Sequence, residues 1–330
     1  MKFGPIPTRD ALGAILAHSA DLASGRLRKG KVLTADDITN LTAQGVQTVT
    51  VAQLDPDDMH EDAAAQKLAD AFMPHGSGLR VTKAATGRVN IIATAPGIFK
   101  CDVSSVEKVN AINPMITIAT QPQYQRVVTG DMVATVKIIS YGVAASDITR
   151  AVQIAKPLAL LTAQHTEVTL IETKIGPDTP SPKGRAAMAT RLDRLGCQLT
   201  RRVVVNHDEG ALAQAISAAS GSMVLILTGS ATSDAYDVAP QAVRAAGGKI
   251  TRFGMPVDPG NLLFVGAIGD KPVIGLPGCA RSLALNGADW VVERTLCGLN
   301  VSDTDIAGMG VGGLLKESPA RHRPRRHPKE

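Results

Sequence analysis

The stretch MVLILTGSATSDAYDVAP, residues 223–240, joins an apolar run to a loop of small polar residues. Its first five residues are all apolar, which is typical of a buried strand. The loop that follows contains Gly229, several hydroxyl side chains and the two carboxylates Asp234 and Asp237. A helical pattern begins at Val238. The stretch therefore predicts a strand, a loop and a helix in succession, which is the repeating unit of a parallel sheet.

The same alternation continues on both sides of this stretch. Apolar runs and amphipathic runs predict strands at 157–163, 167–173, 198–206, 249–255, 262–268 and 271–276, and helices at 182–196, 208–220, 238–248 and 280–299. This rhythm predicts an α/β domain over residues 151–316, with a mostly parallel sheet between helices on both faces.

The first 150 residues have a different composition and pattern, which predict an α+β accessory region. Helical patterns cover 9–24 and 55–73, and a strand, a helix and a strand are expected within 31–54. Thr34 with Asp37 three residues later predicts a capping box at the start of the middle helix. Residues 76–145 are rich in Val, Ile and Thr, which predicts a small β-rich unit with one short helix at 103–110.

Charge is concentrated at one end of the chain. The 330 residues carry a net charge of +5, and the last eleven hold five basic residues against one acidic residue, which accounts for +4. We expect residues 317–330 to form a solvated, disordered tail, with binding to an anion, a membrane surface or RNA as the alternative. Because the rest of the chain is nearly neutral, nucleic acid is not an expected partner.

The cysteine spacing and the apolar runs indicate the compartment. Four cysteines lie far apart, without the spacing of a zinc site and in a chain too long to need a disulfide framework. No apolar run approaches the roughly 20 residues that span a bilayer. We therefore expect a cytoplasmic protein that has no membrane segment.

The loop at 228–237 has the composition of an anion site. Ligands of such sheets bind outside the carboxyl ends of the strands, and Gly229 allows the backbone to approach a ligand closely. Thr228, Ser230, Thr232 and Ser233 supply hydroxyls. The two aspartates would repel a bare phosphate, so they indicate a bridging cation or donors on the ligand. The alternative is a simple turn in which Asp237 caps the following helix.

Two further loops at strand ends contain a Pro-Gly pair. Pro259 and Gly260 lie in MPVDPGN, and Pro277 and Gly278 lie in IGLPGCARS. Such turns are rigid and expose backbone amides. The second pair follows an apolar strand, and we expect it to open the last helix. Three such loops in this order, with GDKPVIG between the last two, form a specific pattern.

This pattern resembles the molybdopterin-binding domain of molybdenum cofactor biosynthesis proteins. The similar motifs are TGSATSDAYD, AAGGKI, DPGN and GDKPVIGLPG, within roughly residues 155–300. The PG…GLPG part is closer to the molybdotransferase branch than to the adenylyltransferase branch. The resemblance implies a three-layer α/β/α fold that binds the phosphate of molybdopterin. The segment before it, with Lys29 and Lys31, is similar to one found ahead of such domains.

The resemblance also implies roles for individual residues. Backbone amides at Gly229, Gly260 and Gly278 would bind the pterin phosphate, and Asp237, with Asp234 beside it, would hold a cation such as Mg²⁺ or polarise an adenylyl phosphate. Thr173, Asp178 and Ser181 would belong to a first phosphate loop that matches only loosely. The chain departs from the family at Ser230, where a second Gly is usual, and at Cys279 and Ala280, where Asn-Pro is usual.

Three functions agree with these observations. The first is molybdate insertion into molybdopterin or its adenylated form, by positioning and electrostatics. The second is a non-catalytic carrier that holds molybdopterin for a nucleotidyltransferase or a molybdoenzyme, which the departures at Ser230 and Cys279 favour. The third keeps only the fold, as in nucleotide pyrophosphatases of the competence-damage type. We expect a homo-oligomer in each case.

Overall fold

The chain divides into two compact units near residue 160. The computed structural model describes residues 1–315 except Ser24 and His75. The first unit comprises 1–95 and 99–160, and the second comprises 96–98 together with 161 onward. The predicted basic tail, 317–330, lies outside the described residues. None of the helices in the described part of the chain has the length and apolar content needed to cross a bilayer.

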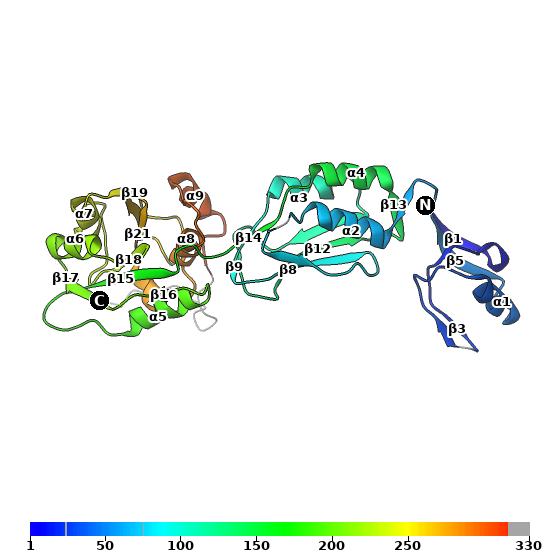
Figure 1. Ribbon diagram of the computed structural model, residues 1–330, viewed down its shortest axis with the longest axis horizontal. Helices are drawn as coiled ribbons and strands as arrows, with labels where there is room; N and C mark the ends of the chain where they lie inside the picture. The colour runs from blue at the N-terminus through cyan, green and yellow to red at the C-terminus, as the bar shows by residue number, and fades with distance from the viewer. Residues whose placement is uncertain (24, 75, 316–330) are drawn as a thin grey trace, which may run out of the picture. The chain divides into compact units, whose positions relative to one another are not determined.

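The first unit is rich in short strands, as its Val, Ile and Thr content predicts (Figure 1). Its elements are β1 Lys2–Pro7, β2 Ile15–Leu16, β3 Ala20–Leu22, β4 Gly25–Leu27, α1 Ala35–Ala43, β5 Thr48–Gln53, β6 Asp58–His60, α2 Glu61–Ala71, β7 Leu79–Val81, β8 Arg88–Ala93, β9 Gly97–Lys100, α3 Val103–Asn110, β10 Ile116–Thr120, β11 Arg126–Val127, β12 Met132–Ile138, β13 Gly142–Ala144, α4 Ala145–Ile154 and β14 Ala159–Leu161.

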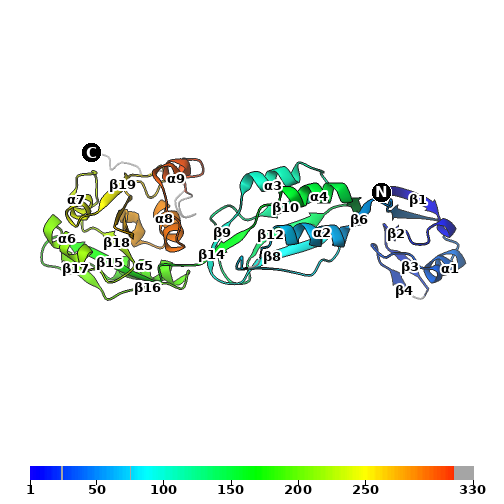
Figure 2. The same cartoon turned by 45° about the horizontal axis from the view of Figure 1, so that its top comes forward.

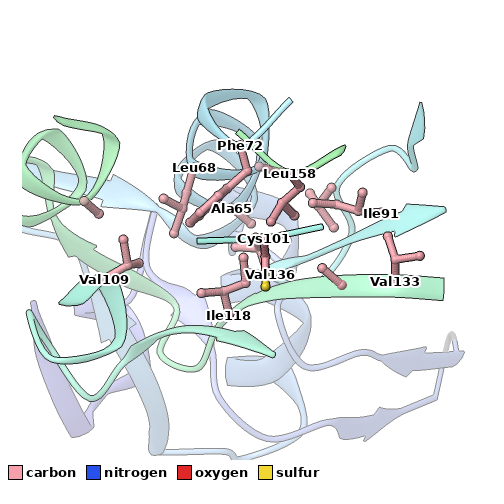
Figure 3. Packing of buried hydrophobic residues seen from close by; sticks show 14 of the residues in the cluster. Ala65, Leu68, Phe72, Ile91, Cys101, Val109, Ile118, Val133, Val136 and Leu158 are labelled. Carbon is pink, nitrogen blue, oxygen red and sulfur yellow. The ribbon is translucent and has the colours of Figure 1, made fainter. Parts of the chain in front are cut away.

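Several small sheets build this unit, and two of them are antiparallel sheets of three and four strands. Strands β1, β5 and β2 form one antiparallel sheet, and β10, β12, β8 and β7 form another. Helices α2, α3 and α4 cover one face of the second sheet (Figure 1). Figure 3 shows the side chains of Leu68, on α2, and of Phe72, directly after α2, directed at the sheet that carries Ile91 and Val136. All four side chains are fully buried.

The prediction of a helix at 9–24 is wrong. A 3₁₀ turn, Thr8–Asp10, is followed by β2 and β3 instead. Residues 14–17 are all buried, and Ile15 and Leu16 pair with β5. Continuous burial suits a paired strand rather than an amphipathic helix, so pairing with a sheet overrode the helical periodicity. The capping box at Thr34 is confirmed, and so is the helix at 103–110.

A buried glutamate begins α2 and makes this unit sensitive to pH. Burial raises the pKa of Glu61, and Lys137, whose Nζ lies 3.7 Å from its carboxylate, offsets this only in part. The folded state therefore holds the proton more tightly than the unfolded chain. Stability is highest when Glu61 is protonated and falls as the pH rises from the ordinary glutamate range through the raised folded pKa.

We expect Glu61→Gln to stabilise the protein near neutral pH and to flatten the stability profile across that window. The neutral amide has no charge to desolvate, which is the physical reason for the gain. Chemical unfolding followed by circular dichroism between pH about 4 and about 7 measures the effect. Glu107→Gln, at an exposed position on α3, is the matched control. Identical profiles of stability against pH for Glu61→Gln and Glu107→Gln would contradict the raised pKa of Glu61.

The second unit has the predicted α/β architecture. Its elements are β15 Glu167–Lys174, α5 Lys183–Asp193, β16 Gln198–Leu199, β17 Val203–Asn206, α6 Glu209–Ser217, β18 Met223–Leu227, α7 Val238–Ala245, β19 Lys249–Phe253, β20 Phe264–Ile268, β21 Lys271–Gly275, a 3₁₀ turn Gly278–Arg281, α8 Gly287–Leu296, α9 Asp303–Ala307 and a 3₁₀ turn Gly308–Gly310.

One sheet of seven strands forms the middle layer. Its order is β16-β15-β18-β21-β20-β19, with β17 also paired to β15. Strands β15, β16, β17, β18 and β21 are parallel, whereas β20 is antiparallel to both of its neighbours. Helices α6 and α7 cover one face, and α5 and α8 lie on the other (Figure 2). The predicted three-layer fold with a mostly parallel sheet is confirmed.

Candidate functional site

Four loops of the second unit meet at one edge of the sheet. In neighbouring strands Glu172 pairs with Leu227 and Ile226 pairs with Gly275, so β15, β18 and β21 end together. Phe264 pairs with both Gly275 and Phe253, so the loop between β19 and β20 turns at this edge as well. The loops are 175–182, 228–237, 254–263 and 276–286. The three loops singled out from the sequence therefore lie along one edge.

Loop 228–237 is tied to the neighbouring strand at its start. The amide of Gly229 donates to Thr173 Oγ1 at 2.7 Å, and a Cβ on Gly229 would lie only 2.8 Å from the carbonyl oxygen of Thr173. Only glycine allows this approach. Thr173 is fully buried, and its hydroxyl also lies 2.8 Å from His207 Nδ1. Thr173 is thus placed to hold the loop.

The hydroxyls of loop 228–237 point in two directions. Thr228 and Thr232 are buried, and their Oγ1 atoms lie 3.4 Å apart. Ser230 and Ser233 are exposed at the sheet edge. The exposed serines and the backbone around Gly229 are therefore the parts of this loop that can reach a ligand.

Asp237 caps α7, as the alternative interpretation of this loop proposes. One carboxylate oxygen accepts from the amide of Val238 at 2.7 Å, and the other accepts from the amide of Ser233 at 3.0 Å. Asp234 is exposed and accepts from the amide of Tyr236 at 2.7 Å. Each carboxylate keeps lone pairs for a further partner. Within residues 1–315, apart from the two gaps, no group of three or more His, Cys, Asp or Glu is arranged to hold a metal ion.

The Pro259–Gly260 turn is fastened to the start of α8. The carbonyl of Pro259 accepts from the amide of Gly287 at 2.8 Å, and a Cβ on Gly260 would lie 2.7 Å from the same nitrogen. Gly260 is buried and has φ +143°, a conformation that favours glycine. This contact gives Gly260 a packing role, and its role in binding stays a prediction.

Pro277 and Gly278 do not open the last helix, which corrects the sequence-based expectation. They lead into the 3₁₀ turn, and α8 begins only at Gly287, where Asn286 and Asp289 form a capping box. The capping signal lies in NGAD rather than in LPG, because Asn286 supplies the side-chain acceptor that Pro277 lacks. Gly278 is exposed and Pro277 is buried.

Arg281, at the end of the 3₁₀ turn, brings a positive charge to this edge. Its Nη2 donates to the carbonyl of Thr228, and its Cγ would lie 3.3 Å from a Cβ on Gly184 at the start of α5. A Cβ on Gly278 would lie 3.8 Å from its Nη1. Arg281 is half-buried, and its guanidinium has no carboxylate partner among the described residues. Four of its five N–H donors have no hydrogen-bond partner among residues 1–315, apart from the two gaps.

Cys279 adds no charge beside this arginine. Burial raises the pKa of its thiol, so the side chain is neutral near pH 7.

Loop 175–182 carries two of the residues that the resemblance places in a first phosphate loop. Asp178 is exposed, whereas Ser181 accepts from the amide of Lys183 at 3.4 Å. Arg202 holds that loop by donating to the carbonyl of Pro180 at 2.6 Å while pairing with buried Glu172.

The sequence matches two family patterns. Residues 168–296 match the family described as "Probable molybdopterin binding domain". These residues belong to that family. Residues 5–53 match a "Domain of unknown function (DUF8806)". No curated protein matches the chain.

Solved structures similar to the chain include two molybdenum cofactor proteins. One is the molybdopterin biosynthesis moea protein from Pyrococcus horikosii, at 15% identity, with 90% of this chain and 75% of that chain covered and a TM-score of 0.31. The other is a Molybdenum cofactor biosynthesis protein B, at 17% identity, with 41% and 96% covered and a TM-score of 0.31.

Two arginines that bear on loop 276–286, Arg281 and Arg191, are not among the site residues predicted from the sequence. Arg281 stands in the quoted loop IGLPGCARS as its one charged residue, which was the signal available for it. Arg191, on α5, gave no signal because its partners lie about 90 residues further along the chain. It is buried, pairs with Asp289 and donates to three carbonyls of the loop at 280–284.

Proposed function

We propose that the molybdopterin-binding domain holds molybdopterin at the carboxyl edge of its sheet, with the phosphate between Arg281 and the loop around Gly229. The observation that carries this proposal is the guanidinium of Arg281, which has one hydrogen bond to the protein and no carboxylate partner within the part of the chain that the structure describes. A guanidinium offers paired donors that match two phosphate oxygens. The exposed hydroxyls of Ser230 and Ser233 add neutral donors along the same loop.

The proposed role is that of a holder in molybdenum cofactor assembly. Asp237 supports this role because both of its oxygens already accept backbone amides. We further propose that the protein works in the cytoplasm, as a homo-oligomer, and passes molybdopterin to a nucleotidyltransferase or a molybdoenzyme. The four cysteines are free thiols, which fits a reducing compartment.

Molybdate insertion is the second candidate. It is favoured by the two carboxylates on loop 228–237, because each keeps lone pairs that a cation such as Mg²⁺ can use. Under this candidate the substrates are molybdate and molybdopterin or its adenylated form, and the loop supplies positioning and charge rather than a nucleophile.

The phosphate site is tested by replacing Arg281. We expect Arg281→Met to weaken binding of a phosphorylated pterin by at least about tenfold, since a hydrogen bond to a charged group is worth about 1.5–3 kcal/mol. Arg281→Lys keeps the charge and should lose less. A fluorescence titration of the pterin at low and high salt measures both variants. The affinity of Arg281→Met should also depend less on salt than that of the parent.

Arg201→Met is the matched control, because Arg201 is exposed and belongs to the same unit. It should bind the phosphorylated pterin as the parent does. Equal affinities for the parent and Arg281→Met would move the phosphate site away from this arginine. Hydrolysis of a nucleotide in the absence of pterin would favour the pyrophosphatase alternative instead.

A further inference from the structure

An exposed tyrosine stands on the same loop as the proposed phosphate site. Tyr236 has 75% of its surface exposed, the largest exposed fraction among the nine aromatic residues of the chain. Phe3, at 58%, is the next. Phe72, Phe99 and Phe264 are fully buried. In a chain with only 3% aromatic residues, this exposed ring gains no stability from burial in the folded protein and is open to a ligand.

The ring of Tyr236 is held in place from one side. The Cζ atom of Arg244 lies over the ring, 5.3 Å from its centroid. Arg244 is itself fixed, because its Nη1 donates to the carbonyl of Ala235 and to Gln241 Oε1, both at 2.7 Å. The backbone of Tyr236 donates to Asp234 Oδ1 at 2.7 Å. A cation–π contact on one face and an anchored backbone present the opposite face to solvent.

Tyr236 and Arg281 mark two points along one loop. Arg281 donates to the carbonyl of Thr228, where loop 228–237 begins, and Tyr236 lies next to its last residue. A fixed, open aromatic face is a surface on which a flat heterocycle stacks, and stacking of this kind tolerates different rings. A ligand that engages both points must carry both a flat ring and a phosphate.

We propose that Tyr236 is a stacking platform for the flat nitrogen heterocycle of the ligand whose phosphate lies at Arg281. This inference rests on the proposed function and adds a residue that positions the ring. The pterin and the adenine of an adenylated form share the required chemistry, so the experiment distinguishes them. Three probes serve this purpose: hydroxymethylpterin phosphate, AMP and inorganic phosphate.

The test compares Tyr236→Ala, Tyr236→Leu and Tyr236→Phe in the full-length protein. Removing the ring should weaken binding of at least one ring-bearing probe by about tenfold, because stacking of a base on an aromatic side chain is worth about 1–3 kcal/mol. Binding of inorganic phosphate should not change. Tyr236→Phe keeps the ring and should bind as the parent does. Phe3→Ala, which removes an exposed ring from the other unit, is the matched control.

Each outcome decides between the possibilities. A loss confined to hydroxymethylpterin phosphate identifies the pterin as the stacked ring, and a loss confined to AMP identifies adenine. Unchanged affinity of Tyr236→Ala and Tyr236→Leu for both ring-bearing probes overturns the platform while leaving the phosphate site intact. A parent protein that binds neither ring-bearing probe overturns the proposed function and the platform together.

Discussion

Replacing Arg191 with methionine is expected to lower the free energy of unfolding by about 3–5 kcal/mol, the cost of breaking a buried ion pair by removing one partner. Arg191 and Asp289 are both only 6% exposed, so the carboxylate would remain buried without its cation. The same substitution removes donors from the carbonyls of Ala280, Ser282 and Ala284. Loop 276–286, which carries Arg281, would lose these hydrogen bonds to α5.

Trp290 gives a direct measurement of this effect. It is the only tryptophan of the chain and lies on α8 next to Asp289, so its fluorescence during denaturant unfolding reports on this unit. Arg201→Met is the exposed control and should change stability little. The double variant Arg191→Met/Asp289→Asn should recover part of the lost free energy of unfolding, since no charge is left buried and asparagine keeps an acceptor for the amide of Asn286. If Arg191→Met lowers the free energy of unfolding by less than about 1 kcal/mol, the Arg191–Asp289 ion pair contributes little to stability.

The Asp237→Asn variant separates the two candidate functions. If the loop carboxylates hold a cation in the transition state, molybdate insertion should fall by about 100-fold or more while pterin affinity changes only a few-fold. If Asp237 only caps α7 and closes the loop, stability or pterin affinity should fall by about 1 kcal/mol, since asparagine keeps one acceptor but loses the other. The parent would then show no insertion activity.

Pterin affinity and molybdate insertion are measured on the same preparation at matched magnesium. Asp234→Asn is the companion variant, because Asp234 is exposed and lies on the same loop. Insertion that proceeds normally in both variants would exclude the loop carboxylates from catalysis. A parent that binds the pterin but inserts no molybdate would support the holder.

Local chemistry explains why parts of the fold follow from the sequence. The α1 helix was predicted because Thr34 and Asp37 satisfy each other's backbone amides within four residues. The sheet was predicted because β18 is a continuous apolar run, as a strand buried on both faces requires. The segment at 9–24 was mistaken because its burial depends on β5, about 35 residues away, and no local signal reports such a pairing.

The site shows the same division between local and distant interactions. Gly229 was found because glycine at a strand end is visible in the sequence, although its close contact with Thr173 is not. Arg281 was missed because one arginine among neutral residues has no distinctive spacing. Its position depends on Gly184 and Thr228, which lie on other elements of the unit.

The reversed direction of β20 determines which parts of this domain can change without affecting one another. Because β20 runs against β21, the connection at 254–263 joins the ligand edge, and the tight turn between β20 and β21, at Gly269 and Asp270, lies at the opposite end of both strands. Both residues of that turn are exposed. Protein engineering can use this separation: a fluorescent reporter or an affinity handle inserted at the β20–β21 turn would leave the four ligand-edge loops untouched, whereas diversity introduced at 254–263 would reshape recognition.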